Sequence, residues 1–441
     1  MVRINGLRGY MPDHIFRPDR RAVMAGLAAA AVLRTNDTAG AQRPLSLRCK
    51  PDFLDLKDGQ LTTPIWSLGN QALRFKRGDR AEITCANDLP APIVLNWRGI
   101  DGAASAEPLL ARPIQKSTGS DAFQLPLRHA GTYLCDAALL GDGAARAVRA
   151  LPLIVAESEP VTADRDEVLL IEGWRLKPDG SALAPGLDAD GTTPVYTVNG
   201  QRTNDIPVRS RERLRLRFIN ALQRHVIALK IEHHNVTIMA LDGQPAEPFL
   251  ARNGAFALAP GGRADVFVDI AANAGTTPIL MHDGEAARPI AQLIMSGEAP
   301  IRAETLPMPG ALPSNGLPAK LDLKSALRVD LAFGGDTKDW LPPATFTTTA
   351  PAFRAKAGRV VVLSLTNRAT TTSTFHLHGH HFRHLDRLDD GWKPFWLDTI
   401  SIDAGQTQRT AFAAEYAGRW LLETVEARWS APRLLRWYSV E

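Results

Sequence analysis

The segment FRAKAGRVVVLSLTN, residues 353–367, has two counterparts in the same chain, and this repetition decides the fold. The counterparts are RFKRGDRAEITCAND at residues 74–88 and IPVRSRERLRLRFIN at residues 206–220. Each segment has a basic turn, then residues that alternate with period two, then an asparagine, Asn87, Asn220 or Asn367. Such alternation is typical of a β-strand with one buried face, and asparagine favours the turn that follows. The sequence therefore predicts three units of one β design.

A second shared element follows each of these segments. HAGTYLCD (129–136) and YAGRWLLE (416–423) both place Ala-Gly before an aromatic strand, and the middle unit has LAPGGRADVFVDI (258–270) instead. Polar or proline-rich segments separate the units, and long apolar helical stripes are scarce. We therefore predict an all-β chain of three consecutive Greek-key β-sandwich domains. Their expected bounds are 42–157, 165–298 and 319–441, with a linker at 299–318.

The first 41 residues are typical of an export signal. Arg20 and Arg21 precede a short alanine-rich apolar run that is too brief to span a bilayer, and Ala39-Gly40-Ala41 supplies small residues for cleavage. The paired arginines favour a twin-arginine signal over an ordinary secretory signal or a buried helix. Either signal predicts a periplasmic bacterial protein without a stable membrane span after cleavage.

The net charge of the chain belongs largely to this signal. Residues 1–41 hold six arginines and three aspartates, so their removal lowers the formal charge from +4 to +1. A nearly neutral chain gives no indication of nucleic-acid binding. The 45% hydrophobic content is enough to fill several cores.

Three cysteines occur, Cys49, Cys85 and Cys135, all in the first third of the chain. In an oxidising compartment two of them could form a disulfide, and the sequence does not say which two. A buried free thiol is an equally ordinary state for each.

The segment TFHLHGHHFRHL, residues 374–385, holds five of the eleven histidines. The alternation of a β-strand places His376, His378 and His380 on one face. His381 and His384 fall off that face, and we expect them to be surface or packing residues.

These features together resemble the multicopper oxidases of the laccase and cupredoxin type. The resemblance covers the whole mature chain and depends on the three repeats together with NWRG, GTYLCD, FHLHGHHF and LDGQPAEP. It implies that the three domains are cupredoxin-like. In that family four histidine-rich motifs hold a type 1 copper, which needs a cysteine thiolate, and a three-copper cluster between the first and third domains.

Comparison with the family motifs implies that most copper ligands have been lost here. Only His376 and His378 keep the family residue, and no cysteine follows residue 135 that could supply the thiolate. The positions that correspond to the other ligands are Asn96, Arg98, Asp136, Ala138, Ser373, Glu423, Thr424, Val425, Trp429 and Leu434.

Charged side chains stand at several of these positions. We expect Arg98 to pair with Asp136 and His378 to pair with Glu423, because a buried charge without a partner is costly. Residual binding of one Cu²⁺ or Zn²⁺ by His376, His378 and His380, with help from Asp136 or Glu423, is an alternative to histidines that only form hydrogen bonds.

The resemblance implies a non-catalytic binding or scaffold protein with a protein partner in the periplasm and no cofactor. SufI-like proteins have this combination of export signal, fold and ligand loss, and they associate with the cell-division machinery. The alternative is a copper-binding oxidoreductase with a reduced metal site. A hydrolase using Asp136, Glu423 and His378 is a weaker candidate.

Overall fold

The computed structural model describes residues 41–441 except 57–61, 272–274, 336–337, 349 and 387–390. The predicted export signal therefore lies, apart from Ala41, outside the described residues. The described residues form strands and four short 3-10 helices, which confirms the prediction of an all-β chain. None of their helices is long and apolar enough to cross a membrane.

The strands follow one another in three groups. The first group is β1 (Gln42–Leu54), β2 (Thr63–Ser67), β3 (Leu73–Lys76), β4 (Arg80–Asn87), β5 (Asn96–Arg98), β6 (Ser120–Pro126), β7 (Gly131–Asp136) and β8 (Leu151–Ala156). The second group is β9 (Arg165–Leu176), β10 (Thr193–Val198), β11 (Asp205–Val208), β12 (Arg213–Asn220), β13 (Ile227–Ile231), β14 (Val236–Leu241), β15 (Gln244–Leu250), β16 (Ala255–Leu258), β17 (Arg263–Asp269), β18 (Thr277–His282) and β19 (Ala287–Met295).

The third group is β20 (Leu327–Phe333), β21 (Arg354–Ala355), β22 (Val360–Asn367), β23 (Ser373–Leu377), β24 (Arg383–His384), β25 (Thr399–Ile402), β26 (Thr407–Ala413), β27 (Gly418–Glu426) and β28 (Leu434–Val440). The 3-10 helices are η1 (Ala104–Ala106), η2 (Ala138–Leu140), η3 (Arg252–Gly254) and η4 (Pro343–Thr345).

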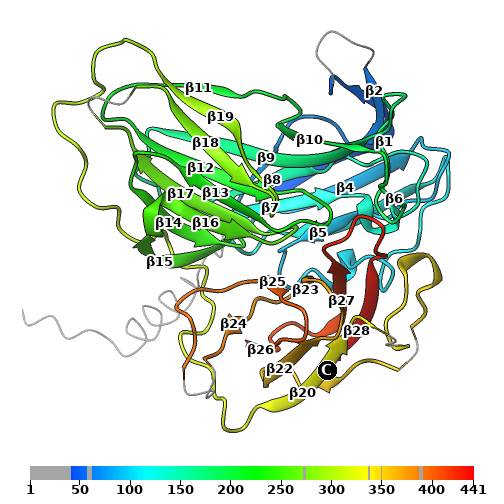
Figure 1. Ribbon diagram of the computed structural model, residues 1–441. Coiled ribbons are helices and arrows are strands. Elements are labelled where there is room, and N and C mark those ends of the chain that lie inside the picture. Colours follow the sequence, from blue (N-terminus) through cyan, green and yellow to red (C-terminus); the bar gives the residue numbers. More distant parts are fainter. Residues whose placement is uncertain (1–40, 57–61, 272–274, 336–337, 349, 387–390) are drawn as a thin grey trace, which may run out of the picture. The chain divides into compact units, whose positions relative to one another are not determined.

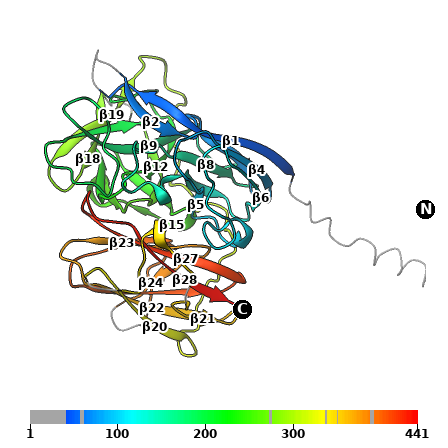
Figure 2. The ribbon, with the colours of Figure 1, turned by 90° about the vertical axis from the view of Figure 1, so that its right-hand side faces the viewer.

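Each group forms two sheets that enclose a core of its own. The sheets are β2-β1-β4-β6 with β3-β8-β7-β5, then β10-β9-β12-β17-β14-β15 with β11-β19-β18-β13-β16, then β20-β22-β26-β24 with β21-β28-β27-β23-β25. The largest apolar clusters draw on residues 47–155, 169–293 and 331–440 in turn. In both Figure 1 and Figure 2, strands β20–β28, coloured yellow to red, lie on one side of the blue-to-green strands.

The repeated segments occupy the same place in all three groups. β4, β12 and β22 each pair in parallel with the first strand of their sheet, β1, β9 or β20. On the other side they pair antiparallel with β6, β17 or β26. The sequence repeat is therefore a structural repeat as well.

The asparagine that ends each repeated strand makes the same hydrogen bonds three times. Asn87, Asn220 and Asn367 are fully buried. The amide Nδ2 of each donates to main-chain carbonyls of the following loop, and its Oδ1 accepts from the N–H two residues later, at 2.9 to 3.0 Å. Each side chain thus closes the turn that the sequence predicted.

Strand β12 differs from the other two repeats because both of its faces are buried. Its arginines, Arg213, Arg215 and Arg217, form ion pairs at 2.6 to 3.2 Å with acidic residues of neighbouring strands and loops. The face that usually meets water is packed here on the first group of strands, since Arg217 also donates to Thr132 of β7 at 2.9 Å.

Candidate functional site: a buried cluster around Arg98 and Glu423

Strands from the first and third groups bring the substituted positions together. The register of β5 and β7 places Asn96 opposite Asp136, and the register of β23 and β27 places His376 opposite Glu423. Alternation along β5 then directs Arg98 to the same side as Asn96. All of these residues are at most 5% exposed.

Arg98 bridges the two groups of strands. Its Nε donates to Asp136 Oδ2 at 2.9 Å, which confirms the expected pair, and its Nη2 donates to Glu423 Oε1 at 2.9 Å. Glu423 also accepts from Arg433, whose Nη2 continues to Gln223 Oε1 at 2.9 Å. Burial alone would raise the pKa of Glu423, but Arg433 and Arg98 outweigh it and hold that pKa well below its usual range. Glu423 is therefore an anion between two cations.

His378 joins this cluster through two carboxylates. Its Nδ1 lies 2.9 Å from Glu107 Oε1, and its Nε2 lies 3.6 Å from Glu423 Oε2. The expected contact with Glu423 is confirmed, although 3.6 Å is too long for a hydrogen bond. Burial lowers the pKa of His378, but Glu107 and then Glu423 outweigh burial and raise it to about 9. His378 is therefore protonated at neutral pH, and Glu107 is its main partner.

His376 is neutral and its tautomer follows from its neighbours. Thr399 Oγ1 donates its single proton to Asp398 Oδ1 at 2.6 Å, so it must accept from His376 Nδ1 at 2.8 Å. Burial outweighs the attraction of Asp398 and lowers the pKa of His376 to about 4. The ring therefore carries its proton on Nδ1, and Nε2 keeps a lone pair with no hydrogen bond within the described residues.

His380 does not share a face with His376 and His378, so that prediction is wrong. Strand β23 ends at Leu377, and the chain turns at Gly379, whose φ of 75° reverses the direction of the next side chain. His380 Nδ1 then lies 2.8 Å from the Tyr438 hydroxyl, and Nε2 accepts from the N–H of Tyr416 at 3.1 Å. Burial lowers the pKa of His380 to about 4 among these aromatic rings.

His381 is not a surface or packing residue, which corrects the second expectation for this stretch. It is buried, with Nδ1 2.8 Å from Asp101 and Nε2 2.8 Å from the carbonyl of Asp242. Burial lowers its pKa, but Asp101 outweighs burial and raises it to about 9, so both ring nitrogens donate. His384 is half-buried and lies 2.8 Å from Gln408 Oε1.

His381 belongs to a second ionic cluster, which we call the His381 cluster and define as Asp101, His129, Asp242, Arg263, His381 and Asp398. Arg263 Nη2 donates to Asp398 Oδ2 at 2.5 Å and to the Asp242 carbonyl at 2.9 Å. His129 lies 3.0 Å from Asp101. The cluster takes residues from all three groups of strands and thereby joins them. None of its buried side-chain atoms lacks a hydrogen-bond partner within the described residues.

The other substituted positions have ordinary packing partners. The N–H of Ala138 donates to Asp136 Oδ1 at 2.9 Å, Ser373 Oγ donates to Asn367 Oδ1 at 3.1 Å, and Trp429 Nε1 donates to the Ala184 carbonyl at 3.0 Å. Thr424 and Leu434 face each other across β27 and β28. Val425 lines the small cavity described next.

A cavity of about 20 Å³ lies beside Arg98, Asp136, His376, Glu423 and Arg433. That volume holds about one water molecule. Several buried atoms of this region have no hydrogen-bond partner within the described residues, namely Asn96 Nδ2 and Oδ1, His378 Nε2, Glu423 Oε2 and Arg433 Nε. Of these residues, Glu423 and Arg433 line the cavity. We call Asn96, Arg98, Glu107, Asp136, His378, Glu423 and Arg433 the Arg98 cluster. Among the residues with described positions, no three His, Cys, Asp or Glu side chains are arranged to share a metal ion.

Sequence reasoning missed seven residues that complete these clusters: Glu107 and Arg433 of the Arg98 cluster, and Asp101, His129, Asp242, Arg263 and Asp398 of the His381 cluster. Glu107 lies next to η1 and Asp398 before β25, so no strand pattern signals them. Arg263 opens β17 inside LAPGGRADV, which was noted only as a strand. The three cysteines are free and buried, so the disulfide alternative does not apply in this structure.

Comparisons with known proteins agree with this architecture. A family profile described as multicopper oxidase matches residues 320–433, and a second with the same description matches residues 172–288. The multicopper oxidase MmcO of Mycobacterium tuberculosis is 23% identical over 89% of this chain and 88% of its own length. Laccase-3 of rice is 26% identical over 56% of this chain, and the match spans only 45% of that protein.

Solved structures show the same fold. A multicopper oxidase from Pseudomonas thermotolerans has a TM-score of 0.77 and 23% identity, over 91% of this chain and all of that one. Lac15 from a marine microbial metagenome has a TM-score of 0.75 and 24% identity, over 90% of this chain and all of that one. These likenesses confirm the predicted cupredoxin-like fold.

Proposed function

This chain belongs to the multicopper oxidase family, and from that premise we propose that it is an exported member which has lost most of its copper ligands. In this proposal it carries no cofactor and acts as a non-catalytic binding or scaffold protein in the bacterial periplasm. Its partner is a protein, and the likeness to SufI-like proteins suggests the cell-division machinery. Export follows the twin-arginine route, which accepts folded proteins.

The observation that carries the proposal is the position of Arg98. Its guanidinium lies 2.9 Å from the carboxylates of both Asp136 and Glu423. A guanidinium has no lone pair to offer a metal ion, and its fixed positive charge repels one. The cation that these carboxylates need is thus already part of the chain.

The donor set around Arg98 does not fit the copper centres of the family. A type 1 copper needs a thiolate, and no cysteine follows Cys135, which is itself buried in the first apolar cluster. A three-copper cluster needs many imidazoles, whereas both nitrogens of His378 face carboxylates and His380 is enclosed by aromatic rings. Only His376 Nε2 keeps a lone pair beside the cavity.

That one lone pair supports the second candidate, an oxidoreductase with a reduced metal site. A single cation in the cavity would lie near His376, Asp136 and Glu423, but in the described part of the chain these three side chains are not arranged to share one. It would have to displace Arg98 and Arg433, each of which already pairs with Glu423. For this reason we favour the copper-free function.

The test is metal analysis of the exported, mature protein after growth with added copper. We expect far less than one copper per chain, no blue absorption band near ~600 nm and no oxygen consumption with a phenol, because that band arises from a copper–thiolate bond. A stoichiometric copper content with phenol oxidation would overturn the proposal in favour of the oxidoreductase.

The division role has a separate test in a strain that lacks the chain. We expect long undivided cells under envelope stress, with full rescue by wild type and by His376→Ala, which removes the imidazole that lines the cavity. Rescue by wild type but not by His376→Ala would contradict a non-catalytic role, and normal division of the deletion strain would contradict the cell-division role.

A further inference from the structure

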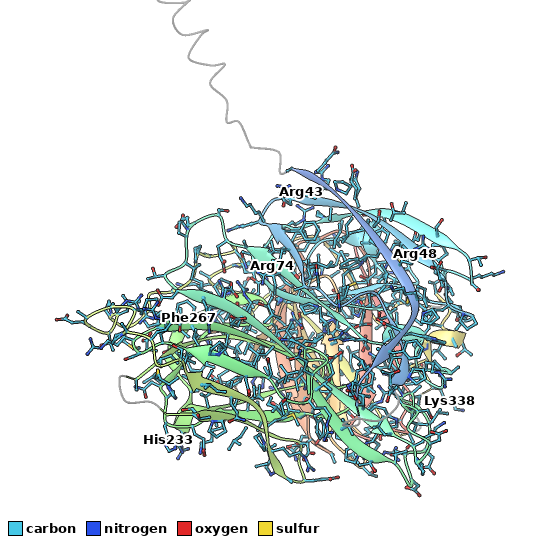
Figure 3. All side chains as sticks on the ribbon, turned by 90° about the horizontal axis from the view of Figure 1, so that it is seen from above. Arg43, Arg48, Arg74, His233, Phe267 and Lys338 are labelled. Carbon is cyan, nitrogen blue, oxygen red and sulfur yellow. The ribbon has the colours of Figure 1, made fainter. Side chains whose placement is uncertain are left out.

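A groove runs along β3, the outer strand of the sheet β3-β8-β7-β5. We define it by Arg43, Leu45, Leu73, Arg74, Phe75 and Lys76 and call it the β3 groove. Its volume is about 580 Å³. It lies far from the Arg98 cluster in the sheet, since β3 and β5 occupy opposite edges of that sheet. Arg43, at the start of β1, and Arg74, in β3, both line this groove, and both are labelled in Figure 3.

The main chain of β3 offers unused hydrogen-bonding groups to the groove. The N–H of Arg77 donates to the Ala156 carbonyl, beside the parallel pair of β3 and β8. In a parallel pair the main-chain groups of every second residue point toward the neighbouring strand, so this bond shows which residues of β3 face β8. In that alternation the main-chain groups of Phe75 point toward β8, and those of Arg74 point away from it. The N–H and C=O of Arg74 have no partner within the described residues, so the strand edge is open to another extended chain.

The side chains of the groove alternate in the way that a bound strand requires. Leu73 and Phe75 are half-buried and form an apolar floor, whereas Arg74 and Lys76 are exposed at the rim. Arg43 adds a third cation, whose side chain is 54% exposed and whose Nε lies 3.7 Å from Asp79 Oδ2. The one acidic residue of the lining, Asp79, is buried and accepts from the N–H of Lys76 at 3.0 Å. The rim therefore has a positive charge that suits an acidic partner.

The groove continues into a second hollow of about 280 Å³, which shares Ala72 and Arg74 with it and extends to Asn199 of the second group of strands. Apart from the shared residues and Asn70, the second hollow is lined by β8, β9 and the residues next to them, so it lies on the β8 side of β3.

The equivalent strands of the other two units, β11 and β21, also lie at the edges of their sheets, but each differs from β3 at the position of Arg74. When the repeats are aligned on Asn87, Asn220 and Asn367, Arg74 corresponds to Pro207 and to Arg354. Pro207 has no N–H to offer a partner strand, so the edge of β11 is blunted. Arg354 already donates to Glu441 Oε1 at 2.6 Å, so an acidic residue of the chain itself occupies that rim. Arg74 and Lys76 have no such side-chain partner within the described part of the chain.

We propose that the β3 groove is the docking site for an extended acidic segment of a partner protein, which adds a strand beside Arg74 and places carboxylates on Arg43, Arg74 and Lys76. Addition of a strand to an open sheet edge is a common mode of peptide recognition, in which main-chain bonds supply affinity and alternate side chains supply specificity. The proposal extends the binding role inferred above and rests on it for its biological meaning, but its test does not depend on copper content.

The test uses two fluorescent heptapeptides, one alternating Glu and Val and the other alternating Lys and Val, with the mature protein and anisotropy as the readout. We expect the acidic peptide alone to bind, and binding to fall by at least about ten-fold in Arg74→Glu/Lys76→Glu, where two rim charges are reversed. The matched control is Arg354→Glu/Lys356→Glu, the same pair in the third unit, and it should bind as wild type does.

Two comparisons isolate strand addition from charge alone. Arg74→Pro removes the outward N–H as Pro207 does in the second unit, so it should bind more weakly than Arg74→Ala, which loses the same charge. Equal binding by Arg74→Pro and Arg74→Ala would overturn strand addition. Tighter binding to anionic phospholipid vesicles than to the acidic peptide would also overturn the proposal, by showing a surface for lipid headgroups.

Copper content measured on the same samples keeps the two proposals apart. Peptide binding by a copper-free sample supports both, and peptide binding by a copper-loaded sample supports the groove while refuting the copper-free function. Failure of the acidic peptide to bind, with a copper-free and folded protein, refutes the groove alone.

Discussion

The Arg98 cluster and the His381 cluster are both buried, ionic and built from strands far apart in the sequence, yet only one is fully satisfied. Every buried polar side-chain atom of the His381 cluster has a hydrogen-bond partner within the described residues, whereas the Arg98 cluster leaves five such atoms without one. Buried polar groups are normally all paired in native proteins. The side chains of the His381 cluster thus satisfy one another, whereas those of the Arg98 cluster lie beside a cavity with room for about one water molecule.

The largest effect is expected from Arg263→Ala in the His381 cluster. Arg263 donates to both carboxylate oxygens of Asp398 and to three main-chain carbonyls, and its loss leaves a buried anion uncompensated. We expect a loss of about 3–5 kcal/mol in the free energy of unfolding, measured by urea denaturation. If Arg263→Ala lost no more stability than Arg98→Met, the claimed difference between the two clusters would be wrong.

A smaller loss in the free energy of unfolding, about 2–3 kcal/mol, is expected from Arg98→Met in the Arg98 cluster. In this variant Glu423 still contacts Arg433 and His378, and Asp136 still accepts from the N–H of Ala138. Less buried negative charge is therefore left without a partner than in Arg263→Ala. The double variant Arg98→Met/Asp136→Asn should recover most of that loss, because the neutral amide no longer needs a cation. If the double variant were less stable than the single one, the charge-replacement argument would be wrong.

The pH dependence of stability should report His381. The pKa of His381 is raised from its ordinary value near 6.5 to about 9 in the folded chain. The stability it contributes is therefore complete below about pH 6.5 and disappears as the pH rises through 9. Since the pKa of His378 is raised to the same value, the readout is the difference between wild type and His381→Gln. That difference should shrink between pH 7 and about pH 10, and a constant difference would contradict a protonated His381.

The smallest effect is expected from a change at Asn96, and it tests the difference between the two clusters most directly. Asn96 is buried without a side-chain partner, so Asn96→Leu should leave the melting temperature unchanged or raise it slightly. Asn315 is its matched control, because its amide bonds Ala130 and Gln244 beside the His381 cluster. Asn315→Leu should cost about 1–3 kcal/mol. Equal losses in both variants would mean that the Arg98 cluster is as well satisfied as the His381 cluster.

The repeats and their turns were predictable because they depend on neighbours in the chain. Asn87, Asn220 and Asn367 each bond the loop that directly follows, and these local bonds recur three times. Each also donates to a more distant carbonyl, that of Gln115, Leu258 or Ile402, which no local pattern signals. The pairing of Arg98 with Asp136 was also predictable, because the resemblance to a known family supplied the juxtaposition of two motifs that lie 38 residues apart.

The predictions for His380 and His381 were wrong because the strand ends before these residues, and their side chains contact residues that are distant in the sequence. The period-two pattern of β23 stops at Leu377, and the turn at Gly379 sends the next two side chains to opposite environments. One environment is a set of aromatic rings and the other is Asp101, which is 280 residues away. No local pattern signals such a partner.

The sequence by itself determined the all-β repeat, the absence of any cysteine after Cys135 and the opposite charges at positions 98, 136 and 423, since each of these is a matter of composition or spacing. Only the tertiary structure decided that Glu107 is the main partner of His378, that Arg433 shares Glu423 and that β3 lies at the edge of its sheet beside a groove. Charge and periodicity are properties of a chain, whereas a pKa, a bond and an open strand edge depend on which distant residues burial brings within a few ångströms.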